Sequence, residues 1–457
     1  SSQGMFRLPW VRRRFGVRCF HLSLAPGHEA LLNAPRCTPV LYSYQVVEHG
    51  QAGLADVCEV LSDGHVVGFG VFNPFSLYRC RVFHVVHRDG PVRSLDESLN
   101  HRMALAVKKR RSAGLPSQST TMFRAVHFEG DALSGLAVDM YGDTAVIYGT
   151  AAWPLIHQEV VERAVRRATG CVWVVWQFAA HSVIQDGWRQ AFPDDTSPIA
   201  RRAAEFLGAE PPQSKLVPPP PPSPAREPQP PRPPEVADKQ RLLVSAVENG
   251  VRYDVTLGKQ KTGHFCDNRE NRSRFRRLAS AQVKPRVLDL FAFSGGFGLS
   301  AAIGAPESQV VAVESNRRAL HFLRQNVALN CVSHRFQVRS DDVFCLMGND
   351  FVNSFDLVSC DPPRFRSRIG KHIGMMQHTS AVAIALRAVK SGGTVFANSV
   401  LGMSSRRRFV DDVVIVAAES VGKKVQSITF APDQVDHPCC PDYPASRVVL
   451  TAWIQVH

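Results

Sequence analysis

The stretch Arg286–Gly298, RVLDLFAFSGGFG, determines the fold expected for the second half of the chain. Its apolar beginning, Val287–Leu290, has the length and composition of a buried strand, and a helix is predicted to begin near Phe297. Between them, Gly295 and Gly296 let the backbone approach a ligand, and the helix N-terminus offers amide donors. The pattern is typical of a nucleotide-type cofactor loop, although an ordinary βα turn of small residues has the same form.

Strand and helix patterns alternate after this stretch, which predicts a parallel sheet covered by helices on both faces. The predicted strands are Val287–Leu290, Val310–Glu314, Phe336–Val338, Leu357–Cys360 and Thr394–Asn398, with helices at Arg317–Asn330 and Ala381–Val389. Val425–Phe430 and Val448–Val456 follow without a crossover helix between them, so they are predicted to form an antiparallel pair. The expected domain is therefore α/β and Rossmann-like, with a seven-stranded, mostly parallel sheet.

Acidic residues follow the predicted strands in order. Glu314 comes about 20 residues after the glycine turn, where a carboxylate accepts both hydroxyls of a ribose. Asp341 and Asp342 follow the third strand, in position to accept from an adenine amino group, and Asp361 follows the fourth. Each carboxylate alone has the simpler explanation of a helix cap. Because the carboxyl ends of parallel strands meet at one edge, the ordered set predicts a single ligand crevice.

Length and composition indicate the number of domains and the kind of binding partner. The chain has 457 residues, which suggests two or three domains, and 54 Lys plus Arg against 40 Asp plus Glu give a formal charge of +14. This excess favours a polyanionic partner such as RNA, although a basic targeting segment and linker explain part of it. No membrane span is predicted. The 11 cysteines form no CxxC pair, so neither a zinc site nor a disulfide framework is indicated.

Residues 1–33 are predicted to be a mitochondrial targeting-like segment, which would place the protein in the matrix. The sequence from Met5 to Leu24, MFRLPWVRRRFGVRCFHLSL, is rich in arginine, and no acidic residue precedes Glu29. Its apolar runs are too short for a secretory signal. A nuclear or RNA-binding arm remains the alternative.

Residues 34–118 contain short β-type runs that break at Gly and Asp, which predicts a small β-barrel-like module. Alternation in its last strand, Ser76–Val86, places Arg79 and Arg81 on one face, facing either phosphate or solvent. A basic helix is expected over Leu99–Ala113.

The central part of the chain carries no catalytic constellation. Residues 119–205 are predicted to form an α/β linking domain, with a turn at Tyr141-Gly142-Asp143 and a helix over Pro154–Thr169. Residues 206–240 are a proline-rich linker, in which 13 of the 31 prolines fall between Pro211 and Pro234. Such a stretch is typical of an extended spacer, and a docking motif for a proline-reading protein is the alternative.

Residues 241–457 resemble the class I S-adenosylmethionine-dependent methyltransferases. The chain from about Ala34 onward resembles the bacterial large-subunit rRNA cytosine carbon-5 methyltransferases with an N-terminal PUA domain. The most specific part is LGKQKTGHFCDNRENR, Leu257–Arg272, which is similar to the family's KTG-aromatic-aromatic-x-D-Q-R-x-x-R signature. LDLFAFSGGFGLSA, VESNRRALHFLRQNVALN, SDDVF and DPPRF follow in the family's order.

The resemblance implies a PUA-like module at residues 34–118, S-adenosylmethionine as cofactor, and RNA as substrate or partner. The implied cofactor-binding residues are Phe291, Ser294, Gly295, Gly296, Glu314, Ser315, Asp342 and Asp361. Basic residues of the signature and of the segment after Asp361 are expected to flank the crevice and contact RNA, notably Lys261, Arg269, Arg272, Arg364 and Arg366. A solvated charged face is the alternative for either cluster.

One departure from the family concerns the chemistry itself. Carbon-5 methylation of a pyrimidine needs a nucleophile, and a thiolate is well suited to attack the neighbouring carbon. The family places this cysteine just after the fifth strand, where the present chain has Val400. His378 and Thr379 replace a Tyr-Lys pair, and Asn268 replaces the signature glutamine.

Other cysteines offer little compensation. Cys439 and Cys440 lie in DHPCCPDYP, a loop that we consider an alternative source of a thiol, whereas Cys360 is expected to be a buried structural residue.

These observations favour a mitochondrial protein that binds large-subunit rRNA during ribosome biogenesis, together with assembly proteins, and that has lost carbon-5 methylation. Cofactor binding would then be structural. The alternative is an active methyltransferase without a covalent intermediate, in which Asp361 helps to accept a proton. A third hypothesis is a structural interaction protein recruited through its proline-rich segment.

Overall fold

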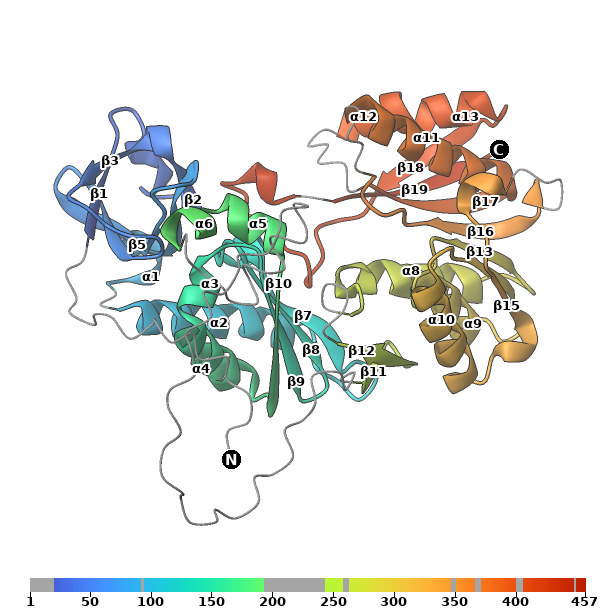
Figure 1. The fold of residues 1–457 in the computed structure, drawn as a ribbon. Helices are drawn as coiled ribbons and strands as arrows, with labels where there is room; N and C mark the ends of the chain where they lie inside the picture. Colours follow the sequence, from blue (N-terminus) through green and yellow to red (C-terminus); the bar gives the residue numbers. More distant parts are fainter. Residues whose placement is uncertain are drawn as a thin grey trace, which may run out of the picture.

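The computed structural model describes residues 20–91, 94–192, 243–257, 263–346, 351–365, 371–399, 406–447 and 449–457. Three parts follow one another along the chain: a β-rich module, a middle α/β unit and a larger α/β domain (Figure 1). Val400, Lys261, Arg366 and the proline-rich linker lie outside the described residues. Among the described helices, none combines the length and apolar character needed to cross a bilayer.

The β-rich module is a six-stranded sheet with the order β2-β6-β5-β4-β1-β3. Its elements are β1 (Phe20–Leu24), β2 (Val40–Tyr42), β3 (Val46–His49), β4 (Val57–Ser62), β5 (His65–Phe72), β6 (Tyr78–Val85), α1 (Val86–Asp89) and α2 (Leu95–Ser112). The module begins earlier than the predicted residue 34, because Phe20–Leu24 pairs with both β3 and β4. In this strand Phe20, Leu22 and Leu24 point into the core, an alternation hidden in the sequence by the arginines before it.

The middle unit is a four-stranded sheet, β10-β9-β8-β7, with a helix layer. Its elements are β7 (Met122–His127), β8 (Leu136–Tyr141), β9 (Thr144–Gly149), α3 (Trp153–Ile156), α4 (Gln158–Thr169), β10 (Trp173–Phe178), α5 (Ala180–Gln185) and α6 (Trp188–Ala191). The predicted turn at residues 141–143 joins β8 to β9.

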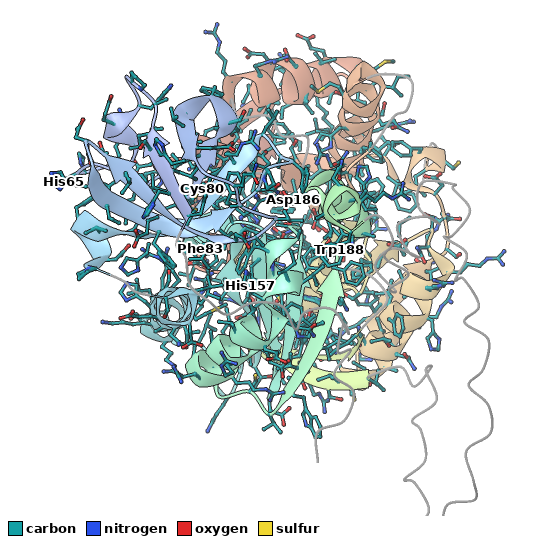
Figure 2. The ribbon with its side chains drawn as sticks, turned by 60° about the vertical axis from the view of Figure 1, so that its left-hand side comes forward. His65, Cys80, Phe83, His157, Asp186 and Trp188 are labelled. Carbon is teal, nitrogen blue, oxygen red and sulfur yellow. The ribbon has the colours of Figure 1, made fainter. Side chains whose placement is uncertain are left out.

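The β-rich module and the middle unit share one hydrophobic core, in which Phe83 packs against Trp153. At their contact, Asp186 accepts from Arg81 at 2.8 Å, and the ring of His157 lies 2.8 Å from the carbonyl oxygen of Ala55 (Figure 2). The predicted phosphate-binding role of Arg81 is therefore wrong, because its guanidinium is buried in an ion pair. Arg79 likewise pairs with Glu48 at 3.2 Å.

The C-terminal domain has a seven-stranded sheet with the order β15-β14-β13-β16-β17-β19-β18, which confirms the predicted architecture. Only the pairs of β19 with β17 and β18 are antiparallel. The elements are α8 (Arg269–Ser280), β13 (Arg286–Leu290), α9 (Gly296–Gly304), β14 (Gln309–Val313), α10 (Arg317–Leu329), β15 (Phe336–Arg339), β16 (Phe355–Cys360), α11 (Lys371–Ala388), β17 (Val389–Ser399), α12 (Arg406–Phe409), α13 (Val416–Ser420), β18 (Val425–Phe430) and β19 (Leu450–Val456). Helices α8, α9 and α10 cover one face, and α11 to α13 cover the other (Figure 1).

A hairpin joins this domain to the middle unit. Strands β11 (Leu243–Glu248) and β12 (Val251–Thr256) pair with each other, and backbone bonds connect Thr121 to Val247 and Ser119 to Gly250. Met122 and Tyr141 of the middle sheet pack into the same hydrophobic core as Tyr253 and Phe275. The middle unit is thus packed directly against the C-terminal domain.

Candidate functional site: a crevice at the strand ends

The glycine turn between β13 and α9 has the expected geometry. Gly295 is the N-cap of α9 and has a φ of +88°, a conformation that favours glycine. A Cβ atom at Gly295 would lie 2.6 Å from Leu323 Cδ1, and one at Gly296 would lie 2.8 Å from Arg272 Cδ. Close packing behind the turn therefore disfavours a side chain at either glycine. The front of the turn and the N-terminus of α9 face the strand ends.

Glu314, just after β14, braces this turn. Its Oε2 accepts from the amide of Phe293 at 2.9 Å, and its Oε1 accepts from the amide of Asn316 at 2.7 Å. Each carboxylate oxygen has two acceptor positions, so Glu314 retains capacity for two ligand hydroxyls. Ser315 next to it is exposed. The geometry is compatible with the predicted contact to a ribose.

Asp342 and three phenylalanines form the next part of the crevice. Asp342 caps the short helix Val343–Cys345 and accepts from the amide of Phe344 at 3.0 Å. Asp341 instead pairs with Arg339 at 2.7 Å. The rings of Phe291, Phe344 and Phe365 lie with their centroids 5.7 to 6.2 Å apart. They offer an apolar wall beside the carboxylates, suited to a flat ring system.

Asp361, at the end of β16, lies between two carboxamides. Asn268 Nδ2 donates to Oδ2 at 2.9 Å, and Asn398 Nδ2 donates to Oδ1 at 2.7 Å. Burial raises the pKa of Asp361 to about 6, although both hydrogen bonds act in the opposite direction. Asn271 and Thr451 hydrogen-bond the carboxamide oxygens of Asn268 and Asn398, so both donors are held in orientation. A carboxyl group with this pKa can hold or accept a proton near neutral pH.

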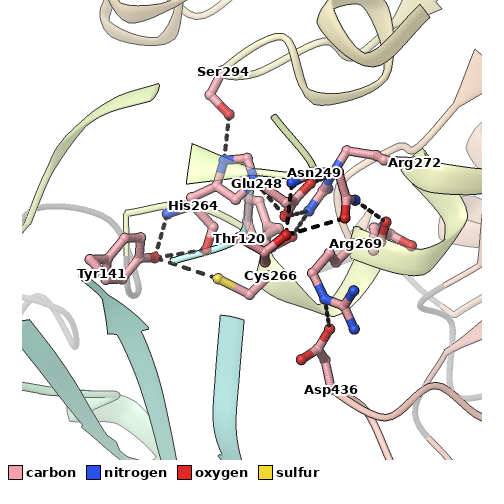
Figure 3. A network of polar contacts seen from close by, with 12 residues as sticks. Thr120, Tyr141, Glu248, Asn249, His264, Cys266, Arg269, Arg272, Ser294 and Asp436 are labelled. Atoms are coloured by element: carbon pink, nitrogen blue, oxygen red, sulfur yellow. Dashed lines mark hydrogen bonds and ion pairs between the residues drawn. The ribbon is translucent and has the colours of Figure 1, made fainter. Parts of the chain in front are cut away.

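A buried polar network supports the turn from below (Figure 3). His264 Nδ1 lies 2.9 Å from Ser294 Oγ, while the His264 amide donates to Tyr141 Oη at 3.1 Å. Arg272 donates to both carboxylate oxygens of Glu248, at 2.6 and 2.7 Å. Burial acts to raise the pKa of Glu248, but the charge and hydrogen bonds of Arg272, with His264, lower it to about 2. The KTG-type signature therefore connects the glycine turn to the middle unit.

This network corrects one prediction. Arg269 and Arg272 were predicted to contact RNA, yet both are buried in ion pairs, Arg269 with Asp436 at 2.5 Å and Arg272 with Glu248. Neither guanidinium is available to a phosphate. Arg364, by contrast, is exposed beside the crevice, so its predicted RNA contact stays a prediction.

One prediction concerned Cys360, and His378 was noted as the replacement of a tyrosine in the resembled family. Cys360 is fully buried, as expected of a structural cysteine, and burial raises the pKa of its thiol. His378 is buried between Phe365 and Phe409, and burial lowers its pKa to about 4, so it serves as a neutral core residue.

Sequence reasoning missed several residues of the site. Asn398 was recognised only as the end of a strand, although it holds Asp361. Asp289, inside β13, accepts from the Gly298 amide at 2.8 Å and from Ser359 Oγ at 2.6 Å, and burial raises its pKa to about 7. The sequence could have indicated the role of Asp289, because a carboxylate in the middle of an apolar strand needs buried hydrogen-bond donors.

The loop Ala431–Arg447 closes one side of the site. Together with Asp267, Asn268 and Arg406 it lines a shallow, open pocket. The remaining lining residues are Phe430, Ala431, Pro432, Asp433, Gln434, His437, Cys439, Arg447, Val449, Leu450 and Thr451. Because Asn268 also contacts Asp361, the pocket lies next to the strand-end crevice.

The same loop contains the two cysteines considered as substitutes for a nucleophile. Cys439 lines the pocket, whereas the thiol of Cys440 faces the carbonyl oxygen of Cys37. Burial raises the pKa of both thiols, and Asp433 raises that of Cys439 further. Both are therefore poor sources of a thiolate.

The architecture and the sequence have known counterparts. Residues 239–399 match the family model of the S-adenosylmethionine-dependent methyltransferases. A putative S-adenosylmethionine-dependent methyltransferase from Streptococcus mutans superposes with a TM-score of 0.66 and 16% identity, covering 95% of this chain and 100% of that one. The fold is that of a class I methyltransferase. A structure of a putative methyltransferase complexed with S-adenosylhomocysteine superposes equally well, with a TM-score of 0.66.

Curated relatives cover nearly the whole methyltransferase-like chain. The ribosomal RNA large subunit methyltransferase I of Escherichia coli strain SMS-3-5 is 27% identical over 432 residues, which is 93% of this chain and 96% of that protein. The enzyme of the same name from Escherichia coli O127:H6 is 28% identical over 431 residues. The similarity thus includes the β-rich module and the middle unit as well as the methyltransferase domain.

The crevice fits the cofactor of the matched family. The front of the Gly295–Gly296 turn, the spare acceptor positions of Glu314, the Asp342 carboxylate and the phenylalanine wall would hold S-adenosylmethionine. When bound, this group supplies an electrophilic methyl. Asp361 lies at the next strand end, held by its two carboxamides.

Proposed function

We propose that this protein binds S-adenosylmethionine in the strand-end crevice and acts on RNA, specifically on large-subunit rRNA. The observation that carries the proposal is the set of Gly295, Glu314, Asp342 and Asp361 at four neighbouring points of one sheet edge. The Escherichia coli relatives, which are named for rRNA of the large subunit, support RNA as the partner. The formal charge of +14 supports it independently.

We further propose a mitochondrial matrix protein of ribosome biogenesis that works with assembly proteins. Support comes from the arginine-rich segment before Phe20. Because Phe20–Leu24 is a core strand, a removable targeting segment would end before it. The six-stranded module is proposed to be PUA-like and to contact RNA, and the proline-rich linker is proposed to be a spacer or a docking site.

Carbon-5 methylation is proposed to be lost. Val400 occupies the position at which the resembled enzymes carry their cysteine, and valine offers no nucleophile. The raised pKa values of Cys439 and Cys440 argue against a replacement from the neighbouring loop. We expect purified wild type to transfer no labelled methyl to cytosine carbon 5, and Val400→Cys to restore transfer. Carbon-5 transfer by wild type would contradict the proposal.

A second candidate function is methyl transfer to an exocyclic amine without a covalent intermediate. The Asp361 carboxyl favours it, because its pKa of about 6 suits a proton acceptor at neutral pH. In this case transfer should rise with pH through about 6, as Asp361 ionises, and should disappear in Asp361→Ala. A flat pH profile would exclude this role.

Cofactor binding is tested by calorimetry on the full chain. Wild type should bind S-adenosylmethionine, and Gly295→Asp should abolish binding, because a side chain there meets Leu323 and strains the backbone. Gly392→Asp is the matched control: Gly392 also has a positive φ, of +76°, but no atom lies within 4 Å of its Cβ position. No binding by wild type, or equal binding by Gly295→Asp, would contradict the cofactor proposal.

A further inference from the structure

Three possible metal ligands gather in the β-rich module, where strand β6 passes into helix α1. They are His84 in β6, Asp89 at the end of α1 and His101 in α2. One ring nitrogen of each histidine and one carboxylate oxygen of Asp89 all lie within 4.8 Å of one another. Two imidazoles and a carboxylate are a common set of protein ligands for a transition-metal ion. No CxxC pair takes part, so the sequence pattern did not indicate this group.

His84 offers a buried lone pair. The residue is 3% exposed, and its Nε2 lies 2.9 Å from the carbonyl oxygen of Gly90. Because a carbonyl oxygen can only accept, Nε2 carries the ring proton and Nδ1 keeps its lone pair. Nδ1 has no hydrogen-bond partner among the residues that the structure describes. A backbone carbonyl on the other ring nitrogen is the arrangement that orients metal-binding histidines.

His101 brings a second ring nitrogen to the same place. Its Nε2 is buried, has no hydrogen-bond partner in the described part of the chain, and lies 3.5 Å from Asp89 Oδ1. Around a four-coordinate ion with bonds of about 2.0 to 2.2 Å, neighbouring ligand atoms lie about 3.3 to 3.6 Å apart. The two atoms therefore already have the spacing of ligands. The side chain of His101 is 37% exposed, so an ion can reach the group from solvent.

Asp89 is held in orientation by several donors. Its Oδ2 accepts from the amide of Val85 at 2.9 Å and from Arg102, and Arg88 donates to both carboxylate oxygens at 3.0 and 2.9 Å. Donors of this kind orient a ligating carboxylate. The two guanidiniums also oppose a cation that oxygen ligands hold by charge alone, which disfavours Mg²⁺ and Ca²⁺. Burial, with Arg102 nearby, lowers the pKa of His84, which keeps its imidazole neutral.

We propose that His84, Asp89 and His101 bind one Zn²⁺ ion, with water as the fourth ligand. Bonds to the two imidazole nitrogens would supply most of the affinity, because the neighbouring arginines offset the charge of the carboxylate. The ion would connect β6, α1 and α2. Since α2 packs against β6 of the β-rich module and against α4 of the middle unit, the ion would stabilise the contact between these two parts. The inference depends neither on cofactor binding nor on RNA as the partner.

Competition for Zn²⁺ between the metal-free full chain and a chromophoric chelator tests the proposal. Wild type should bind one Zn²⁺ ion that His101→Gln binds at least about tenfold more weakly, since the loss of even an outer partner of a metal ligand costs about 10- to 100-fold in affinity. His65→Gln is the matched control, because His65 is an exposed histidine of β5 outside the group, and it should bind as wild type does. Equal affinity of wild type and His101→Gln would overturn the proposal.

Two measurements on the unaltered protein give further readouts. One equivalent of Co²⁺, a spectroscopic substitute for Zn²⁺, should show the visible absorption of a four-coordinate ion without a thiolate charge-transfer band, because no cysteine is a ligand. Excess Mg²⁺ should not displace it. Zn²⁺ should also raise the unfolding midpoint of wild type but not that of His101→Gln, while the metal-free proteins should unfold at similar temperatures. A thiolate band, displacement by Mg²⁺ or an unchanged wild-type midpoint would contradict the assigned ligands.

Discussion

The guanidinium of Arg272 is buried beneath the glycine turn. Its partner Glu248 is 1% exposed, and His264 and the carbonyl oxygen of Phe265 complete the surroundings. The guanidinium also lies against Gly296, so the position of the turn depends on the ion pair. Arg272, which was predicted to contact RNA, thus helps to support the cofactor crevice.

Replacement of Glu248 by Gln should strongly destabilise the protein. The change leaves the Arg272 charge buried without its partner, which costs about 3 to 5 kcal/mol of unfolding free energy. Denaturant unfolding at pH 7 measures this loss. Glu48→Gln is the control, because Glu48 pairs with Arg79 at an exposed position and should cost less than about 1 kcal/mol. Similar losses for the two variants would contradict the assigned role.

The same pair predicts a pH dependence. The folded pKa of Glu248, about 2, lies below the ordinary value of 4.5, so its ionisation stabilises the folded state above pH 4.5. This contribution should be lost as the pH falls from about 4.5 to about 2. The difference in unfolding free energy between wild type and Glu248→Gln should therefore shrink across this window. A constant difference from pH 6 to pH 3 would be inconsistent with the pair.

At the residue scale, the positions of residues after predicted strands identified the site better than the distribution of charged residues did. Gly295, Glu314 and Asp361 were predicted from their places after successive strands, and the structure brings them to one edge. The role of Asn398 could not be predicted, because it depends on a contact with Asp361, which lies in another segment of the sequence. Arg269 and Arg272 were misassigned, since a count of charges does not reveal which guanidiniums a fold buries.

At the scale of elements, the loop Ala431–Arg447 links all three parts of the chain. Asp442 accepts from the amide of Cys37 in the β-rich module, and the rings of His437 and His127 lie 3.7 Å apart at the middle unit. Figure 1 shows the loop reaching from the C-terminal domain toward the β-rich module. Burial and nearby arginines lower the pKa of both histidines, so the contact is between neutral rings.

Gly130→Ala should release this loop. A Cβ atom at Gly130 would lie 1.9 Å from the carbonyl oxygen of Pro438, so the two segments cannot keep their contact. We expect Cys439 and Cys440, half-buried in the wild type, to react faster with a thiol reagent. Gly142→Ala is the control, because no atom lies within 4 Å of its Cβ position; its φ of +61° adds a backbone strain that Gly130 does not have. Unchanged thiol reactivity in Gly130→Ala would show that the loop tolerates the change.

Elements with a clear periodicity were predicted well. Val425–Phe430 matches β18, and the predicted helix at Arg317–Asn330 differs from α10 by one residue. Strand β1 was missed because the arginines before Phe20 dominated the interpretation of that segment. Helix α11 begins ten residues earlier than predicted, at Lys371 rather than Ala381, because its first turns alternate small, polar and apolar residues without an apolar stripe.

At the scale of the whole molecule, two hydrophobic cores are shared between neighbouring parts of the chain. Phe69 and Phe83 of the β-rich module pack with the middle unit, and Tyr141 of the middle unit packs with the methyltransferase domain. The sequence predicted three parts in the right order, but not that neighbouring parts would share two cores beside the cores that the β-rich module and the C-terminal domain have of their own. Such sharing is a property of tertiary contacts, which composition and periodicity do not encode.

Shared cores predict cooperative unfolding. Because unfolding of one part would expose apolar surface on its neighbours, heating should produce a single calorimetric transition. The calorimetric and van't Hoff enthalpies should then agree. Two or three separated transitions would mean that the interfaces contribute little, and limited proteolysis during heating would identify the part that unfolds first.

The hairpin β11–β12 and the segment that ends at Phe192 flank the proline-rich stretch. Before the stretch, Phe192 packs against Trp188, and after it the hairpin that begins at Leu243 is bonded to Thr121. Both ends are therefore fixed to the middle unit. Doubling the length of a closed loop costs only about 0.6 kcal/mol, so insertions and deletions there should accumulate at almost no cost in stability. Related chains can thus change the reach of this segment while the crevice stays the same.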